Sequence, residues 1–332
     1  MATGPATLPD SLDGRGLSTI TTTMAADASV PTQGTAYHPQ HFAAGVPVYF
    51  HGLTGGKHLA LLRERWTDAT VGDLGPQSYT EHTAVHFPGA VVIDPVTGRQ
   101  GATMDLPGRM TRLSGACGQR SLFWTSGTTV DAEAIVSLYR VTGSGGIELV
   151  ADEVLPAIDD VLFDAGCALD AGNLVVFGRD TEDKVYGMRK LASRVGVQTE
   201  QAPWRYSGGA RGWQPDVADL DSIGLESAGP VSMAQRSDGT WMTTVAVDTD
   251  GVRTGQVYRT QRLVSTAWSP VGEVVALGDD DSYLGGGLYL QPQINANLAV
   301  TETPALTYVT SVLNAEASEE SIQTAWGYQS VV

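Results

Sequence analysis

The sequence predicts an all-β protein, a five-bladed β-propeller with an extended N-terminal arm. Three observations predict it: short β-type apolar runs recur from about residue 46, hairpin-turn signals separate them, and five copies of the pattern fill the chain. The 39 glycines and 16 prolines are scattered between these runs, as in proteins with many turns. A β-sandwich or a pair of small β-domains is the alternative that the pattern leaves open.

Composition sets the first 36 residues apart as an arm. They contain no aromatic residue, since Tyr37 is the first, and Ala, Thr, Ser, Gly and Pro dominate. Such a segment buries too little apolar surface to offset the entropy that it loses on ordering. We therefore expect residues 1–36 to be an extended arm or anchor, ordered by a neighbouring chain or by the propeller of residues 37–332.

The two clearest copies of the repeat begin at hairpin turns. Asp-Ala-Gly-Asn at 170–173 precedes the apolar run 174–180, and Ser-Asp-Gly-Thr at 237–240 precedes the run 241–247. Glycine and asparagine favour such turns because the turn types that join antiparallel strands need positive φ. Each copy then continues through a polar turn into a third strand that contains Val-Tyr.

Weaker copies extend the repeat over the rest of the chain. The second strands are expected to begin near Val48, Leu122, Leu174, Trp241 and Leu298. This spacing of roughly 50–75 residues suits a blade of four strands. The innermost strands are then expected at 35–42, 111–118, 161–169, 229–235 and 288–293.

Two further segments complete the predicted arrangement. The interval from Thr67 to Pro107 is longer than one outer strand needs, so it predicts a loop insertion that contains Glu81, His82 and His86. The final apolar run, 321–328, is expected to be the outer strand of the last blade.

The charge balance excludes several classes of partner. The formal net charge is -17, with Lys+Arg 20 against Asp+Glu 37, and such a surface repels nucleic acid and anionic membranes. No basic-then-apolar segment opens the chain and no apolar run approaches the ~20 residues of a membrane span. We expect synthesis in the cytoplasm without a signal peptide, with Cys117 and Cys167 as buried free thiols.

Carboxylates on the innermost strands are the residues that a propeller glycosidase would need. Asp164 is the only one in the predicted strands, while Asp105, Asp160 and Glu226 lie near strand ends. A glycosidase uses a pair of carboxylates across the scissile bond. We therefore expect no catalysis, and name Asp164, Asp160 and Glu226 as the catalytic candidates if the chain is a glycosidase-like enzyme.

Aromatic residues suggest where a sugar could bind. Trp204, Tyr206 and Trp213 flank a glycine-rich stretch that contains Arg211. Aromatic faces beside arginine can stack on sugar rings, so these four residues are the candidate ligand-binding set; packing between blades explains them equally well.

The sequence gives little reason to expect a metal or a cofactor. His82 and His86 have a spacing that could hold a metal with Glu81, but ordinary loop histidines explain them, and no cofactor is predicted. The acidic runs 248–251 and 279–281 are explained as tight turns, the second also as a cation site. The glycine-rich stretch 52–58 is a hairpin turn and departs from a phosphate loop in length and in its last residue.

The repeats resemble the blades of five-bladed propellers of the arabinanase-like class. The resemblance rests on 172–180 with 185–189 and on 238–245 with 257–261, and it covers roughly residues 40–332 as a repeat pattern. It implies the propeller fold, but it supplies no catalytic motif that matches residue by residue.

The chain as a whole resembles minor tail proteins of phages that infect actinobacteria. It combines a start without a signal, the arm, an arginine bias in which Lys57, Lys184 and Lys190 are the only lysines, and an aromatic last strand. This resemblance implies a structural virion component, located in the tail. It would be anchored to other tail proteins through residues 1–36, with a propeller that meets host cell-wall glycan or a neighbouring protein, and with homo-oligomers as an option. The alternative is a glycoside hydrolase or carbohydrate-binding propeller that acts on cell-wall polysaccharide.

Overall fold

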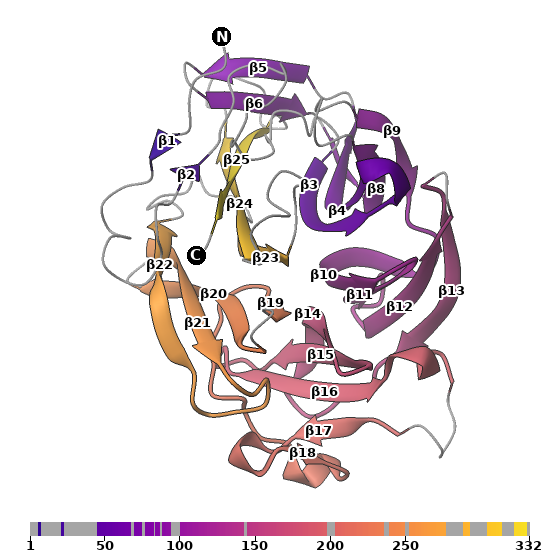
Figure 1. Cartoon of the computed structure of the whole chain (residues 1–332), viewed down its shortest axis with the longest axis vertical. Coiled ribbons are helices and arrows are strands. Elements are labelled where there is room, and N and C mark those ends of the chain that lie inside the picture. Colours follow the sequence, from indigo (N-terminus) through magenta and orange to yellow (C-terminus); the bar gives the residue numbers. More distant parts are fainter. Residues whose placement is uncertain are drawn as a thin grey trace.

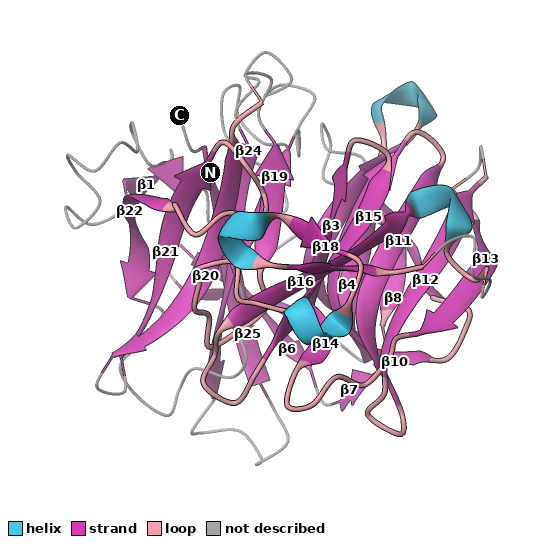
Figure 2. Ribbon diagram, turned by 90° about the horizontal axis from the view of Figure 1, so that it is seen from below, coloured by secondary structure: helices cyan, strands magenta, loops and turns pink. Residues whose placement is uncertain are grey.

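The strands of this protein form a ring of sheets around a central axis (Figure 1). The computed structural model describes residues 6–7, 21–22, 45–67, 70–74, 77–82, 84–86, 88–93, 100–142, 145–197, 203–235, 239–249, 252–276, 288–292, 304–313 and 322–330. Seen from the side, the strands run between the two faces of the ring (Figure 2). The predicted all-β propeller fold is confirmed. Within the described residues, no helix has the length and apolar character needed to cross a membrane.

Three sheets are built from consecutive antiparallel strands. The second sheet contains β10 (Met110–Gln119), β11 (Leu122–Thr129), β12 (Ala134–Val141) and β13 (Ile147–Val154). The third contains β14 (Leu162–Asp170), β15 (Asn173–Arg179), β16 (Val185–Leu191), β17 (Arg205–Ser207) and β18 (Trp213–Gln214). The fourth contains β19 (Ser232–Gln235), β20 (Trp241–Thr249), β21 (Val252–Thr260) and β22 (Ser269–Ala276).

The short connections of these sheets follow the turn chemistry expected from the sequence. Ala171 and Gly172 have φ of 46° and 81° in the turn between β14 and β15, and Asp183 has φ 63° before β16. Short 3-10 helices occupy other connections, namely Thr54–Gly56, Ala192–Arg194, Gly209–Arg211 and Val217–Asp219. The predicted innermost strands at 111–118, 161–169 and 229–235 correspond to β10, β14 and β19.

The first sheet corrects one register prediction. It contains β3 (Gly45–Gly52), β4 (His58–Thr67), β8 (Gly89–Ile93) and β9 (Gln100–Asp105), with β7 (Ala84–His86) paired to β4. The prediction that Val48 opens a second strand is wrong, because among the described strands β3 pairs only with β4 and packs against β10 and β23 (Leu288–Pro292) as the innermost strand. The predicted innermost segment 35–42 lies outside the described residues.

The last sheet is assembled from both ends of the chain. Its order is β23, β24 (Pro304–Leu313), β25 (Ile322–Ser330), β6 (Gln77–His82) and β5 (Thr70–Leu74). Four sheets are therefore blades whose strands follow one another in chain order. The prediction of five equivalent blades is wrong, because in the last sheet β25 pairs with β6, a strand from near the other end of the chain. The run 321–328, predicted as an outer strand, is the third strand of this sheet. The interval after Thr67, predicted as a loop insertion, contributes strands. Leu298, predicted to open a second strand, lies outside the described residues.

The described part of the predicted arm is small. It consists of β1 (Ala6–Thr7) and β2 (Thr21–Thr22), which pair antiparallel, and β2 lies against β25. The rest of residues 1–36 lies outside the described residues.

The first strands of the sheets close the ring. They contact one another in the cycle β3, β10, β14, β19, β23 and back to β3, and β10, β14, β19 and β23 are labelled around the centre of Figure 1. Glycines allow this approach: a Cβ on Gly115 would lie 3.0 Å from the Cα of Gly166, and one on Gly166 would collide with the carbonyl oxygen of Val231. The N–H of Val231 donates to the carbonyl of Ala165 at 2.7 Å, which joins the third sheet to the fourth.

Apolar side chains between neighbouring sheets form the core. Phe123 and Tyr139 stack at 4.9 Å between the first and second sheets, and Phe177 and Trp241 pack between the third and fourth. Cys117 and Cys167, on adjacent first strands, are buried free thiols with their sulfurs 3.4 Å apart. Their predicted burial is confirmed.

Candidate functional site

A bulge in the third sheet carries the one carboxylate predicted on an innermost strand. Leu162 of β14 pairs with Arg179 of β15, but the next pair is Gly166 with Phe177, so three residues of β14 face one residue of β15. Asp164 is the middle residue of this bulge and is only 6% exposed. A bulge bends its strand and redirects its side chains, so the irregular backbone sets where the Asp164 carboxylate points.

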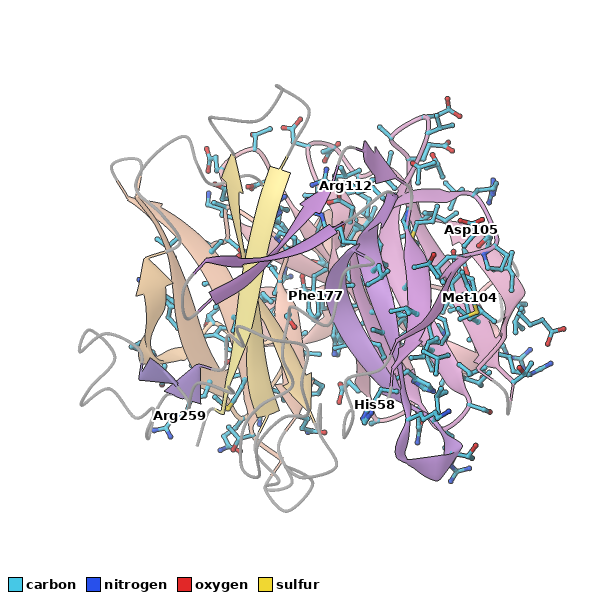
Figure 3. The ribbon with its side chains drawn as sticks, turned by 90° about the horizontal axis from the view of Figure 1, so that it is seen from above. His58, Met104, Asp105, Arg112, Phe177 and Arg259 are labelled. Atoms are coloured by element: carbon cyan, nitrogen blue, oxygen red, sulfur yellow. The ribbon has the colours of Figure 1, made fainter. Side chains whose placement is uncertain are left out.

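Two arginines of the neighbouring sheets also lie at irregularities in strand pairing. In the second sheet the pairing of β10 with β11 shifts on both sides of Arg112 and Leu113. In the first sheet Val46 pairs with Glu64 and Pro47 with Leu62, so Arg63 faces no residue of β3. In Figure 3 Arg112 lies at the upper end of the ring and His58 at the lower end.

These residues meet in one electrostatic cluster with a third arginine. The Asp164 carboxylate interacts with the guanidinium groups of Arg179, Arg112 and Arg63, so side chains from three consecutive sheets lie at the same end of the ring. We call Arg63, Arg112, Asp164 and Arg179 the arginine–aspartate cluster. Arg112 is exposed, whereas Arg63 and Arg179 are half-buried.

Burial and the arginines act in opposite directions on Asp164. Burial raises its pKa, the three arginines lower it, and burial is the larger effect, so the pKa lies above its ordinary value. A carboxyl group with a raised pKa retains its proton to higher pH than an exposed aspartate. Asp164 therefore exchanges its proton at a higher pH than an exposed aspartate does.

Arg179 connects the cluster to the adjoining loops. Its Nη1 donates to the carbonyl oxygen of Ser227 at 3.1 Å and to Oδ1 of Asp183 at 3.4 Å. Its Nε is buried and has no hydrogen-bond partner among the described residues. The side chain is thus held in place while one donor stays unused.

The other candidate carboxylates lie around the cluster rather than in it. Asp160 lines a cavity of about 470 Å³ with Glu133, Asp159 and Leu162, and Glu226 is exposed on a second cavity of about 490 Å³ with Tyr258 and Trp268. Asp105 is exposed at the end of the outer strand β9 (Figure 3). Among the described hydrogen bonds, none joins Asp160 or Glu226 to Asp164.

The candidate aromatic set divides into two places. Trp204 donates its Nε1–H to Glu153 at 2.9 Å, and the ammonium of Lys190 lies 5.5 Å from its ring, so a buried polar network holds this side chain. Tyr206 is half-buried against the core between the second and third sheets. Trp213 and Arg211 line a cavity of about 370 Å³.

That third cavity lies at the opposite end of the first strands from the cluster. Its lining includes Asp170 and Gln235, the last residues of β14 and β19, and Trp241. The guanidinium of Arg189 lies 4.8 Å from the Trp213 ring, and Arg211 pairs with Asp219 at 2.6 Å. Trp213 and Arg211 are thus brought together as predicted, although sugar contact there stays a prediction.

The candidate metal-binding histidines lie on strands of different sheets. His82 ends β6 and pairs with Ile322, whereas His86 ends β7 and pairs with Arg65. Within the part of the chain that the structure describes, no three His, Cys, Asp or Glu side chains gather as metal ligands.

Sequence reasoning missed the three arginines of the cluster. Strand alternation cannot place them, because bulges interrupt the alternation at Arg112 and Arg63. The one local signal was a charged residue within the predicted innermost strand 111–118, where the alternation otherwise favours small and apolar side chains.

Comparisons with known proteins agree with the fold. No family model matches the chain, and no curated protein matches it by sequence. Among solved structures, a "putative hydrolase" from Bacteroides ovatus aligns with a TM-score of 0.59 and 11% identity, over 97% of this chain and 93% of that one. Zg3597, a family 117 glycoside hydrolase from Zobellia galactanivorans, aligns with a TM-score of 0.50 and 9% identity, over 100% and 90%.

At these identities the likeness supports the propeller fold alone. It agrees with the predicted resemblance to propellers of the glycosidase type. These similar structures show no link to the phage tail proteins of the other predicted resemblance.

Proposed function

We propose that this chain is a carbohydrate-binding propeller that takes a glycan at the arginine–aspartate cluster. The observation that carries the proposal is Asp164, a buried carboxylate on a bulge where three sheets meet. A fold shared with a family 117 glycoside hydrolase agrees with it. Carboxylates and guanidinium groups together offer acceptors and donors for sugar hydroxyls, and bulges frequently mark such sites.

Glycoside hydrolysis is the second candidate function. The direction of the Asp164 pKa shift favours it, because the acid that protonates a leaving sugar must hold its proton to a higher pH than an ordinary aspartate does. The reaction also needs a second carboxylate across the scissile bond. Asp170, the other carboxylate of the described first strands, lies at the far end of β14, so the second group would come from an adjoining loop. Asp183, which accepts from Arg179, and Glu226, which precedes the Arg179 partner Ser227, are the candidates there.

The test compares Asp164→Asn with Asp131→Asn. Asp131 is an exposed carboxylate in the turn after β11, so it controls for loss of one charge. Calorimetric titration with arabinan, xylan, arabinogalactan and polygalacturonate is expected to show binding that Asp164→Asn weakens at least about tenfold and that Asp131→Asn leaves unchanged. Release of reducing ends by the unmodified protein, lost in Asp164→Asn, would establish hydrolysis. Binding that is unaffected by Asp164→Asn, or absent for every glycan, would refute the proposal.

A place in a phage tail is a separate prediction. Attachment through residues 1–36 to other tail proteins, and self-association, are untested by the fold and receive no support from the comparisons. Light scattering of the full chain and of a chain that starts at Tyr37 would measure self-association and whether residues 1–36 are needed for it.

A further inference from the structure

Three arginines interact electrostatically with one buried carboxylate in a strongly acidic protein. The chain has 20 Lys+Arg against 37 Asp+Glu, yet Arg63, Arg112 and Arg179 lie within electrostatic range of Asp164. They come from β4, β10 and β15, which belong to three consecutive sheets. Two of them lie at pairing irregularities, so the backbone departs from regular strand geometry where it presents them.

The cluster has guanidinium donors that the protein itself leaves unused. Among the described residues Arg112 makes no hydrogen bond or ion pair, and the buried Nε of Arg179 has no partner. A guanidinium offers five donors in a planar fork, and a buried donor without an acceptor costs free energy.

We infer that the glycan bound at this cluster carries a carboxylate, as uronic-acid polysaccharides do, and that Arg112 and Arg179 bind that carboxylate. The inference rests on the proposed function and names its substrate class. Arginine pairs with carboxylates through two parallel hydrogen bonds, a geometry that neutral hydroxyl groups do not match.

The acidic surroundings restrict an anionic ligand to the arginine–aspartate cluster. Asp131, Asp159 and Glu226 are exposed on the described surface, and the protein as a whole repels anions. Charges farther than about 8 Å are screened at physiological salt, so the adjacent arginines dominate at the site itself. An anionic sugar thus finds attraction at the cluster and repulsion over the acidic surface.

The experiment compares charged and neutral forms of the same polymers. The probes are polygalacturonate, alginate and hyaluronate, each beside its carboxyl-reduced form, with dextran sulfate as a non-specific polyanion. Binding is measured by calorimetric titration for the full chain and for Arg112→Gln. The matched control is Arg259→Gln, which removes one exposed arginine far from the cluster at the opposite end of the ring (Figure 3).

We expect at least one uronate polymer to bind about 10- to 100-fold more tightly than its carboxyl-reduced form. Arg112→Gln is expected to remove most of that preference, and Arg259→Gln to leave it intact. Equal binding of the reduced forms, or dextran sulfate binding as tightly as the uronates, would overturn the inference and leave the proposed function standing. If the protein bound neither these polymers nor the neutral glycans, both this inference and the proposed function would be overturned. Thermal unfolding of each variant shows whether it is folded.

Discussion

In the buried ion pair between Glu153 and Lys190, which joins the second and third sheets, each charge depends on the other for its stability in the core. Lys190 Nζ lies 2.7 and 3.0 Å from the two carboxylate oxygens, and the side chains are 2% and 5% exposed. Glu153 also accepts from the N–H of Gly196 at 2.8 Å and from Trp204 at 2.9 Å. Lys190 additionally donates to the carbonyl of Val197 at 2.9 Å.

Replacing Lys190 by methionine keeps the length of the side chain but leaves the Glu153 charge buried without its counter-charge. Breaking a buried pair from one side costs about 3–5 kcal/mol. The double variant Glu153→Gln with Lys190→Met removes both charges, while the glutamine oxygen still accepts from Gly196 and Trp204. It is expected to lie within about 1–2 kcal/mol of the original protein, since replacing a whole buried pair is often close to neutral.

Guanidinium unfolding followed by circular dichroism measures these free energies. The control is Arg140→Met, which breaks an exposed pair with Glu148 at 3.2 Å in the same second sheet. An exposed pair contributes about 0–1 kcal/mol. If Lys190→Met cost no more than Arg140→Met, or if the double variant were as unstable as the single one, the reasoning would be refuted.

Three further changes test other parts of the structure. Because the folded-state pKa of Asp164 is raised, its ionised form is less favourable in the folded protein than in the unfolded chain. Asp164→Asn removes that buried charge and should therefore stabilise the protein at pH 7. The gain in free energy of unfolding, measured in urea, should shrink as the pH falls toward the ordinary pKa of 3.8, because the carboxyl group is then protonated in both states. A gain that grew on acidification would contradict this sign. Gly166→Ala should lower the free energy of unfolding by about 3 kcal/mol or more, because the added Cβ would collide with Val231. Gly172→Ala meets no neighbour and should lower it by about 1–2 kcal/mol, from the positive φ alone. Equal losses of the two variants in urea unfolding would refute the role of the close approach at Gly166. Cys117 and Cys167 are buried, and burial raises the pKa of the Cys117 thiol, so a disulfide reagent should label neither in the native protein and both after unfolding; rapid native labelling would disagree.

Local signals in the sequence were enough to place most of the strands. The turn at Ala171 and Gly172 joins β14 to β15 where glycine and asparagine predicted it, because a hairpin is specified by a few adjacent residues. Such signals could not show whether β3 is a first or a second strand, since both are short apolar runs. The pairing of β25 with β6 lay further out of reach, because no local residue pattern encodes a partner near the other end of the chain.

The candidate site could be predicted only in part for a similar reason. Asp164 was found because it is a carboxylate within a predicted innermost strand. Its neighbours Arg112 and Arg63 were missed because bulges place them, and a bulge depends on how two strands pair rather than on one sequence. Trp204 was named for sugar contact because its partner Glu153, fifty-one positions away, could not be seen from the aromatic pattern.

The sheet that joins β25 to β6 also sets the order in which the protein can be completed during synthesis. Ile322 pairs with His82, so β6 leaves the ribosome early, and its partner strand β25 is synthesised only after almost all of the remaining chain. Until then its backbone N–H and C=O groups form an unpaired edge, which is the kind of surface through which incomplete chains associate wrongly. Bringing such distant segments together is slow compared with forming a hairpin. A nascent chain stalled before residue 322 would therefore carry four blades that can form and a last sheet that lacks β25, the strand that joins β24 to β6.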